Sequence, residues 1–116
     1  MNFLNTFWYN TSGASSFETK WRTTLNNQSI TLPYVSSGTY SGTIDWGDGT
    51  VVANTYANRS HTYITSGDYN VVIDGECSKW NFATTNSAAT KIIGVLGWGT
   101  YSFKECSFSN CGNFIG

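Results

Sequence analysis

The sequence contains few of the residues that enzymes use most often for catalysis. It has a single histidine, and charged residues make up only 11% of its 116 positions. No serine or cysteine lies in a pattern typical of an activated nucleophile, such as a nucleophile elbow. The histidine, His61, lies within a turn-and-strand motif, so we expect it to be a hydrogen-bonded structural residue. The sequence therefore predicts no enzyme and no catalytic residue.

Carboxylates are also sparse, with only seven in the chain. A glycosidase needs two of them about 5–10 Å apart in a cleft. Asp45 and Asp48 are close in sequence, but they flank a glycine-rich turn, where we expect them to bond the backbone. Their oxygens also make them calcium candidates, although D-W-G-D-G-T lacks the ligand density of an EF-hand loop. We predict no cofactor and no metal centre, and Asp45 and Asp48 stay as the calcium candidates.

The sequence has neither a basic stripe nor a long apolar run. Its net charge is −1, which gives little support for a nucleic-acid partner. No segment approaches the roughly 20 apolar residues of a membrane span, so membrane insertion is not expected. Residues 1–4 lack the basic start and apolar run of a secretory signal. If Met1 is the natural first residue, the chain stays in the cytoplasm or leaves inside a particle; if a signal has been removed, it is exported.

Three cysteines are present, at positions 77, 106 and 111. An odd number argues against a complete disulfide framework. Cys106 and Cys111 form a bridge if their Cα atoms approach to about 6 Å, and otherwise all three are half-buried thiols in a reducing compartment. A zinc site would need a fourth ligand, and the C-x4-C spacing is poor for one. The sequence therefore does not predict zinc.

What the sequence does contain is a pair of β-hairpin signals. Residues 43–46 alternate with the period of a half-buried strand, and residues 47–49, Gly-Asp-Gly, then favour a tight turn. Residues 61–73 repeat the pattern with an extended H-T-Y, a Ser-Gly-Asp turn, and a strand whose alternate residues share one face. Aromatic residues reach 16%, and no long helix is indicated. The sequence therefore predicts a single all-β domain.

The hairpin motif resembles the polycystic-kidney-disease-type (PKD) domain, an immunoglobulin-like β-sandwich. The match covers about residues 28–75, and the residues that carry it are Trp46, Gly47, Asp48, Gly49, His61, Tyr63, Gly67 and Tyr69. The resemblance implies that Tyr63 bonds the backbone at a corner, as the buried tyrosine of immunoglobulin-like folds does. It says little about function, because such domains are mostly spacers and adhesion modules.

Eight strands are expected, with Ile30 and Leu32 pointing inward and residues 51–55 at an edge. The predicted ranges are 17–24, 29–32, 40–46, 51–55, 61–63, 68–73, 78–82 and 91–96. The chain then divides into an N-terminal arm (1–16), a PKD-like β-sandwich (17–82) and a C-terminal extension (83–116). Beyond residue 75 the alternating pattern loosens.

Large apolar residues are frequent at both ends of the chain, where they are candidates for docking. These are Phe3, Leu4, Phe7, Trp8, Tyr9, Phe108 and Phe114. The arm either folds back over its own sandwich or docks on a neighbouring subunit, since exposed apolar groups usually mark an interface.

A narrower resemblance extends over residues 17–24, 92–99 and 108–111. These segments look similar to parts of PKD-like units in bacterial leucine-rich-repeat surface proteins, and related units occur in phage virion proteins. One incomplete repeat cannot bury its own face, so no repeat-borne function is expected. The implied role is a structural component of the virion surface, such as a capsid decoration or a tail or fibre accessory protein. Its partners would be copies of itself or a capsid or tail protein.

Two alternatives remain open at this point. One is a fragment of a bacterial adhesin at the cell surface. The other is a carbohydrate-binding module, which would hold a glycan against exposed aromatic faces. The aromatic candidates for that role are Trp8, Trp21, Trp80, Trp98, Tyr34, Tyr40, Tyr56 and Tyr101.

Overall fold

In the computed structural model, residues 16–82, 91–97 and 105–107 are described, and they contain nine β-strands and no α-helix. The strands are β1 (Ser16–Thr23), β2 (Gln28–Thr31), β3 (Tyr40–Asp45), β4 (Val51–Ala53), β5 (Ser60–Tyr63), β6 (Gly67–Cys77), β7 (Lys79–Asn81), β8 (Ile92–Gly97) and β9 (Glu105–Ser107). The prediction of an all-β domain is confirmed. Each of the eight expected ranges overlaps a strand, whereas β9 lies where none is expected.

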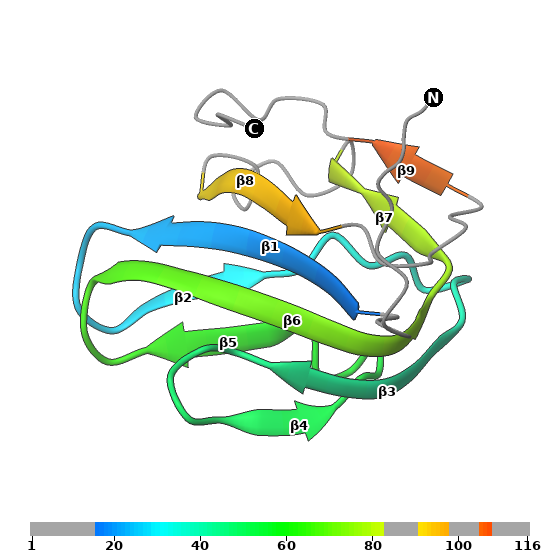
Figure 1. The fold of residues 1–116 in the computed structure, drawn as a ribbon, viewed down its shortest axis with the longest axis horizontal. Helices are drawn as coiled ribbons and strands as arrows, with labels where there is room; N and C mark the ends of the chain where they lie inside the picture. The colour runs from blue at the N-terminus through cyan, green and yellow to red at the C-terminus, as the bar shows by residue number, and fades with distance from the viewer. Residues whose placement is uncertain (1–15, 83–90, 98–104, 108–116) are drawn as a thin grey trace.

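The strands form one large sheet and two small ones (Figure 1). The large sheet has the order β4-β3-β6-β1-β8, and all of its neighbours are antiparallel. Strands β2 and β5 form an antiparallel pair, and β7 and β9 form a parallel pair. The expected edge position of residues 51–55 is confirmed, because β4 ends the large sheet. Strand β8 lies in the range expected to form the extension, yet it pairs with β1.

The core lies between the large sheet and the β2–β5 pair, which Figure 1 shows behind it. Inward residues from all three sheets belong to one hydrophobic cluster. Its largest fully buried side chains are Trp21, Trp46, Trp80, Tyr63, Phe17, Phe82, Ile30, Leu32, Ile44, Ile73, Ile92 and Val71. This arrangement is that of a β-sandwich, and the inward orientation of Ile30 and Leu32 is confirmed.

Strand β1 shows why the alternation in the sequence matters. Phe17, Thr19, Trp21 and Thr23 are buried, whereas the residues between them are exposed or partly exposed. The buried hydroxyl of Thr19 accepts a hydrogen bond of 2.7 Å from the indole Nε1 of Trp21. An indole donor inside a core needs such an acceptor, and Thr19 supplies it without interrupting the apolar face.

Strand β6 runs four residues beyond its predicted end. Gly42 of β3 and Gly75 of β6 face each other in register, with φ angles of 91° and 127°, and pairing continues as far as Tyr40 and Cys77. Glycine carries no hydropathy signal, so the alternating pattern stops where the strand in fact continues. The Cys77 thiol is buried, whereas the side chains of Cys106 and Cys111 lie outside the described residues.

Candidate functional site

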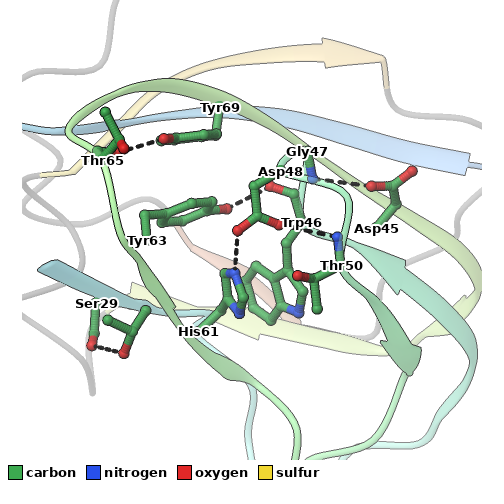
Figure 2. Close-up of polar contacts among 11 residues, drawn as sticks. Ser29, Asp45, Trp46, Gly47, Asp48, Thr50, His61, Tyr63, Thr65 and Tyr69 are labelled. Atoms are coloured by element: carbon green, nitrogen blue, oxygen red, sulfur yellow. Dashed lines mark hydrogen bonds and ion pairs between the residues drawn. The ribbon is translucent and has the colours of Figure 1, made fainter. Parts of the chain in front are cut away.

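The residues of the W-G-D-G-T motif form a turn stabilised by its own carboxylates (Figure 2). The Trp46 amide donates to the Thr50 carbonyl at 2.9 Å, which closes the turn between β3 and β4. The Gly47 amide donates to Asp45 Oδ1 at 3.0 Å, and the Thr50 amide donates to Asp48 Oδ1 at 3.1 Å. The prediction that both aspartates bond the backbone is confirmed.

Two of the motif glycines lie where the turns meet the large sheet, and one of them, Gly47, is required by close backbone geometry. Gly47 has a φ of 84°, and a Cβ at this position would lie 2.4 Å from the carbonyl oxygen of Asn70. Only glycine fits there, because β6 passes directly beside the turn. Gly67 begins β6, and its amide donates to Thr23 Oγ1 at 3.1 Å, which joins the start of β6 to the end of β1.

Asp48 and His61 form a polar contact between the turn and β5 (Figure 2). Their Oδ2 and Nε2 atoms are 2.7 Å apart, and the side chains are 23% and 17% accessible. Burial by itself raises the pKa of Asp48, but the hydrogen bonds from His61 and Thr50 outweigh it, so this pKa lies below its usual value. The carboxylate of Asp48 therefore holds the turn through one oxygen and β5 through the other.

Aromatic rings extend this contact into a stack. The His61 ring lies over Trp46, with centroids 4.9 Å apart and planes inclined by 16°, and it meets Tyr63 edge-on at 4.8 Å. Tyr63 in turn stacks on Tyr69 at 3.9 Å. The Tyr63 hydroxyl donates to the Trp46 carbonyl at 2.7 Å, and burial, with the nearby negative charges, raises its pKa. The expected backbone bond of Tyr63 is thus confirmed.

The hydrogen bonds of Asp48, Tyr63 and the Nε2 atom of His61 are made within the cluster and its turn. Within the described residues, His61 makes its hydrogen bond to Asp48, and no hydroxyl or thiol bonds to its ring. The calcium candidates Asp45 and Asp48 each use an oxygen on a backbone amide. The same part of the chain contains no group of three or more histidine, cysteine, aspartate or glutamate residues that could hold a metal ion. The arrangement is suited to holding a turn, not to activating a nucleophile.

Sequence reasoning missed a second polar centre, the buried Asn54. Its Nδ2 donates to the carbonyls of Ser41 and Glu76, at 2.9 Å each, and its Oδ1 accepts from the Tyr34 hydroxyl at 2.5 Å. Its amide donates to the Gly42 carbonyl at 2.8 Å. Asn54 therefore ties β4, β3 and β6 together just where the two glycines meet. Its position after a short strand gives no signal, because a polar residue there is typical of a loop.

Four of the eight aromatic candidates for glycan binding are buried or partly buried, which disfavours them as sugar platforms. Trp21, Trp80 and Tyr34 are buried, and Tyr40 is partly buried and stacks on Tyr34 at 3.9 Å. Among the candidates that the structure describes, Tyr56 is left as the exposed one, with Arg59 over its ring. The other candidates, Trp8, Trp98 and Tyr101, lie outside the described residues, as do the docking candidates Phe3, Leu4, Phe7, Trp8, Tyr9, Phe108 and Phe114.

Replacing Asp48 with asparagine is expected to destabilise the fold by about 1 kcal/mol at neutral pH and by less in acid. The folded-state pKa of Asp48 lies below its unfolded value, so ionisation of this carboxylate stabilises the folded state. That contribution is present above an unfolded pKa of about 3.9 and is lost as the pH falls through the folded pKa. Urea unfolding of both proteins across this range measures the difference.

The partner residue provides the control. In a His61→Gln background, the same Asp48→Asn change is expected to cost less, because one of its two hydrogen bonds is already gone. The assigned role of the charge would be contradicted if the difference in unfolding free energy between the natural chain and the Asp48→Asn variant stayed constant from neutral pH into acid.

A search for relatives adds no assignment to this picture. The cluster around Trp46, Asp48, His61 and Tyr63 is therefore understood from its own contacts, as a set of side chains that secure one end of the sandwich. No helix in the described part of the chain has the length and apolar character needed to cross a membrane. No protein-family model, curated protein or solved structure matches the chain.

Proposed function

We propose that this protein is a non-enzymatic structural or adhesive module built on a PKD-like, immunoglobulin-type β-sandwich. The observation that carries the proposal is the set of contacts that His61 makes with Asp48, Trp46 and Tyr63. A catalytic histidine presents a ring nitrogen to a nucleophile or a substrate. His61 stacks on Trp46 and bonds Asp48 through Nε2, and no hydroxyl or thiol of the described residues bonds to its ring. The only histidine of the chain thus supports the fold.

Two features support the immunoglobulin-type assignment within the all-β class. A large antiparallel sheet faces a smaller one across a single core rich in tryptophan. Tyr63 is fully buried and donates its hydroxyl to a backbone carbonyl in a neighbouring turn. A tyrosine with this role near a corner is typical of immunoglobulin-like sandwiches.

Within this class, the role we propose is a component of a phage virion surface, either a capsid decoration or a tail or fibre accessory protein. The low charge of the chain and the apolar residues near both ends of the sequence favour association with other protein subunits. Copies of the chain itself, or a capsid or tail protein, would be its partners. Mass spectrometry of purified particles tests the proposal, which fails if peptides of this chain are absent from them.

Removal of residues 1–12 is expected to convert an oligomer of the purified chain into a monomer. The segment contains Phe3, Leu4, Phe7, Trp8 and Tyr9, and burial of such side chains between subunits supplies the association energy of many interfaces. Light scattering over a range of concentrations measures the change. A full-length variant with these five residues replaced by serine separates the effect of apolar contact from that of chain length.

A monomer both with and without the segment would contradict self-assembly through the arm. It would indicate that the arm covers its own sandwich, and the adhesin alternative, at a bacterial cell surface, would then gain support.

A further inference from the structure

The large sheet has one side turned away from the core, which we call the outer face. In β6, Tyr69, Val71 and Ile73 point inward, so the alternate residues of this strand point outward. The register extends this assignment to the neighbouring strands. The outer face carries Glu18, Lys20 and Arg22 of β1, Thr43 and Asp45 of β3, Val51 of β4, and Asp68, Asn70, Val72, Asp74 and Glu76 of β6.

A mixed row of aliphatic and acidic residues crosses the outer face at right angles to the strands. Asp45 pairs with both Val51 and Val72, and Val72 pairs with Glu18, whose other neighbour is Gly97 beside Leu96. Val51 and Leu96, at the two ends of this row, are 57% and 52% exposed. Aliphatic and acidic side chains therefore alternate across the full width of the sheet.

More than half of the charged residues of the chain lie on this face. The chain has six basic and seven acidic residues, and seven of these thirteen lie here. Five are acidic and two are basic, which gives the face a net charge of −3, whereas the whole chain has −1. Arg22 is already held by Asp68 through contacts of 2.8 and 3.0 Å. The carboxylates of Glu18 and Asp45 lie within the mixed row, Glu76 lies farther along β6, and one lysine, Lys20, shares the face with them.

We propose that the outer face docks a protein partner whose surface presents lysine or arginine side chains around aliphatic ones. The basic side chains of such a surface would pair with the carboxylates, and its aliphatic side chains would contact the valine and leucine side chains of the mixed row. The negative charge of the outer face would repel the outer face of a second copy, and it would also repel the phosphates of a nucleic acid. A metal ion is not favoured either, because the described residues contain no set of acidic side chains close enough to hold one.

This inference deepens the proposed function, since it names the partner chemistry of a non-enzymatic module, but it does not depend on the N-terminal arm. Its test is an NMR titration of the full chain with a short peptide of alternating lysine and valine. The expected result is a set of shifts confined to outer-face residues of β3, β6 and β1, which weaken when salt rises from about 0.05 M to about 0.5 M. The same peptide with glutamate in place of lysine is expected not to bind.

Variants locate the binding on the face. Changing Glu18→Gln, Asp45→Asn and Glu76→Gln together is expected to weaken binding about tenfold, since each exposed charge pair contributes modestly. Asparagine at position 45 keeps the oxygen that accepts from Gly47, so the turn is retained. Lys20→Gln is expected to tighten binding. Thr62→Glu, an acid added on the outside of the β2–β5 pair, is expected to leave it unchanged.

The proposal would be overturned by shifts centred on another surface, by equal binding of the lysine and glutamate peptides, or by equal binding of the lysine peptide to the natural chain and the triple variant. Dimerisation of the free chain that the triple variant strengthens would also overturn it, because the occupant would then be a second copy. Loss of the chain from purified particles would contradict the virion role and leave the peptide result unaffected, so the two failures are distinguishable.

Discussion

Asn54→Ala is expected to lower the free energy of unfolding by about 3–5 kcal/mol. The change removes the acceptor for the Tyr34 hydroxyl and the donor for the carbonyls of Ser41 and Glu76. Because Asn54 is only 1% exposed, water does not replace these bonds freely, and each buried group left without a partner costs about 1–3 kcal/mol. Domains of this size have a total stability of about 5–15 kcal/mol, so the loss is a large fraction. Urea unfolding measures it.

Asn58→Ala is the matched control for this experiment. Asn58 lies in the same connection between β4 and β5, but it is exposed, and its side chain donates to one carbonyl, that of Ala53. An exposed hydrogen bond contributes little, so we expect a loss below about 1 kcal/mol. If the two variants unfold at the same urea concentration, the three side-chain hydrogen bonds of Asn54 do not carry the stability assigned to them.

Gly42→Ala is expected to destabilise the sandwich by more than about 4 kcal/mol and to reduce the yield of folded protein. A Cβ at this position would lie 1.8 Å from the carbonyl oxygen of Asp74 and 2.8 Å from the Cα of Gly75. Both neighbours are backbone atoms of β6, which cannot rotate away as a side chain would. The φ of 91° adds a further penalty for any residue with a Cβ. Relief therefore requires β3 to move away from β6.

Gly49→Ala separates the two causes. Gly49 has a similar φ of 96°, but a Cβ added there would meet nothing within 4 Å, so this variant reports the backbone penalty alone. We expect it to cost about 1–2 kcal/mol. Thermal unfolding of both variants gives the comparison, and similar melting temperatures would show that the approach of β3 to β6 is looser than the structure indicates.

The parts of the fold that the sequence predicts are those that depend on local pattern. In strand β1, buried and exposed side chains alternate. At the Gly-Asp-Gly turn, the carboxylates of Asp45 and Asp48 accept hydrogen bonds from nearby backbone amides. Both features follow from residues near in sequence. The contact between Asp48 and His61 is different, because neither residue's type indicates that the turn will lie against β5. The role of Asn54 depends on the positions of three other strand or loop segments, none of which is local. Of the two hairpin signals, the first is confirmed by the pairing of β3 with β4, whereas the second is wrong, because β5 pairs with β2. Distant pairing therefore escaped prediction, as did the strand β9.

The position of β1 in the large sheet affects how the chain folds during its synthesis. Glu18 pairs with Val72 of β6 on one side and with Gly97 of β8 on the other. Strand β1 can therefore pair fully only after both of these later strands have been synthesised. While the chain is being synthesised, β3 and β4 can form their hairpin early, but the strand that carries Phe17 and Trp21 has no neighbour until β6 emerges. Folds dominated by such distant pairings close slowly, in about milliseconds to seconds. A nascent chain that ends before residue 92 would still leave one edge of β1 open to intermolecular pairing.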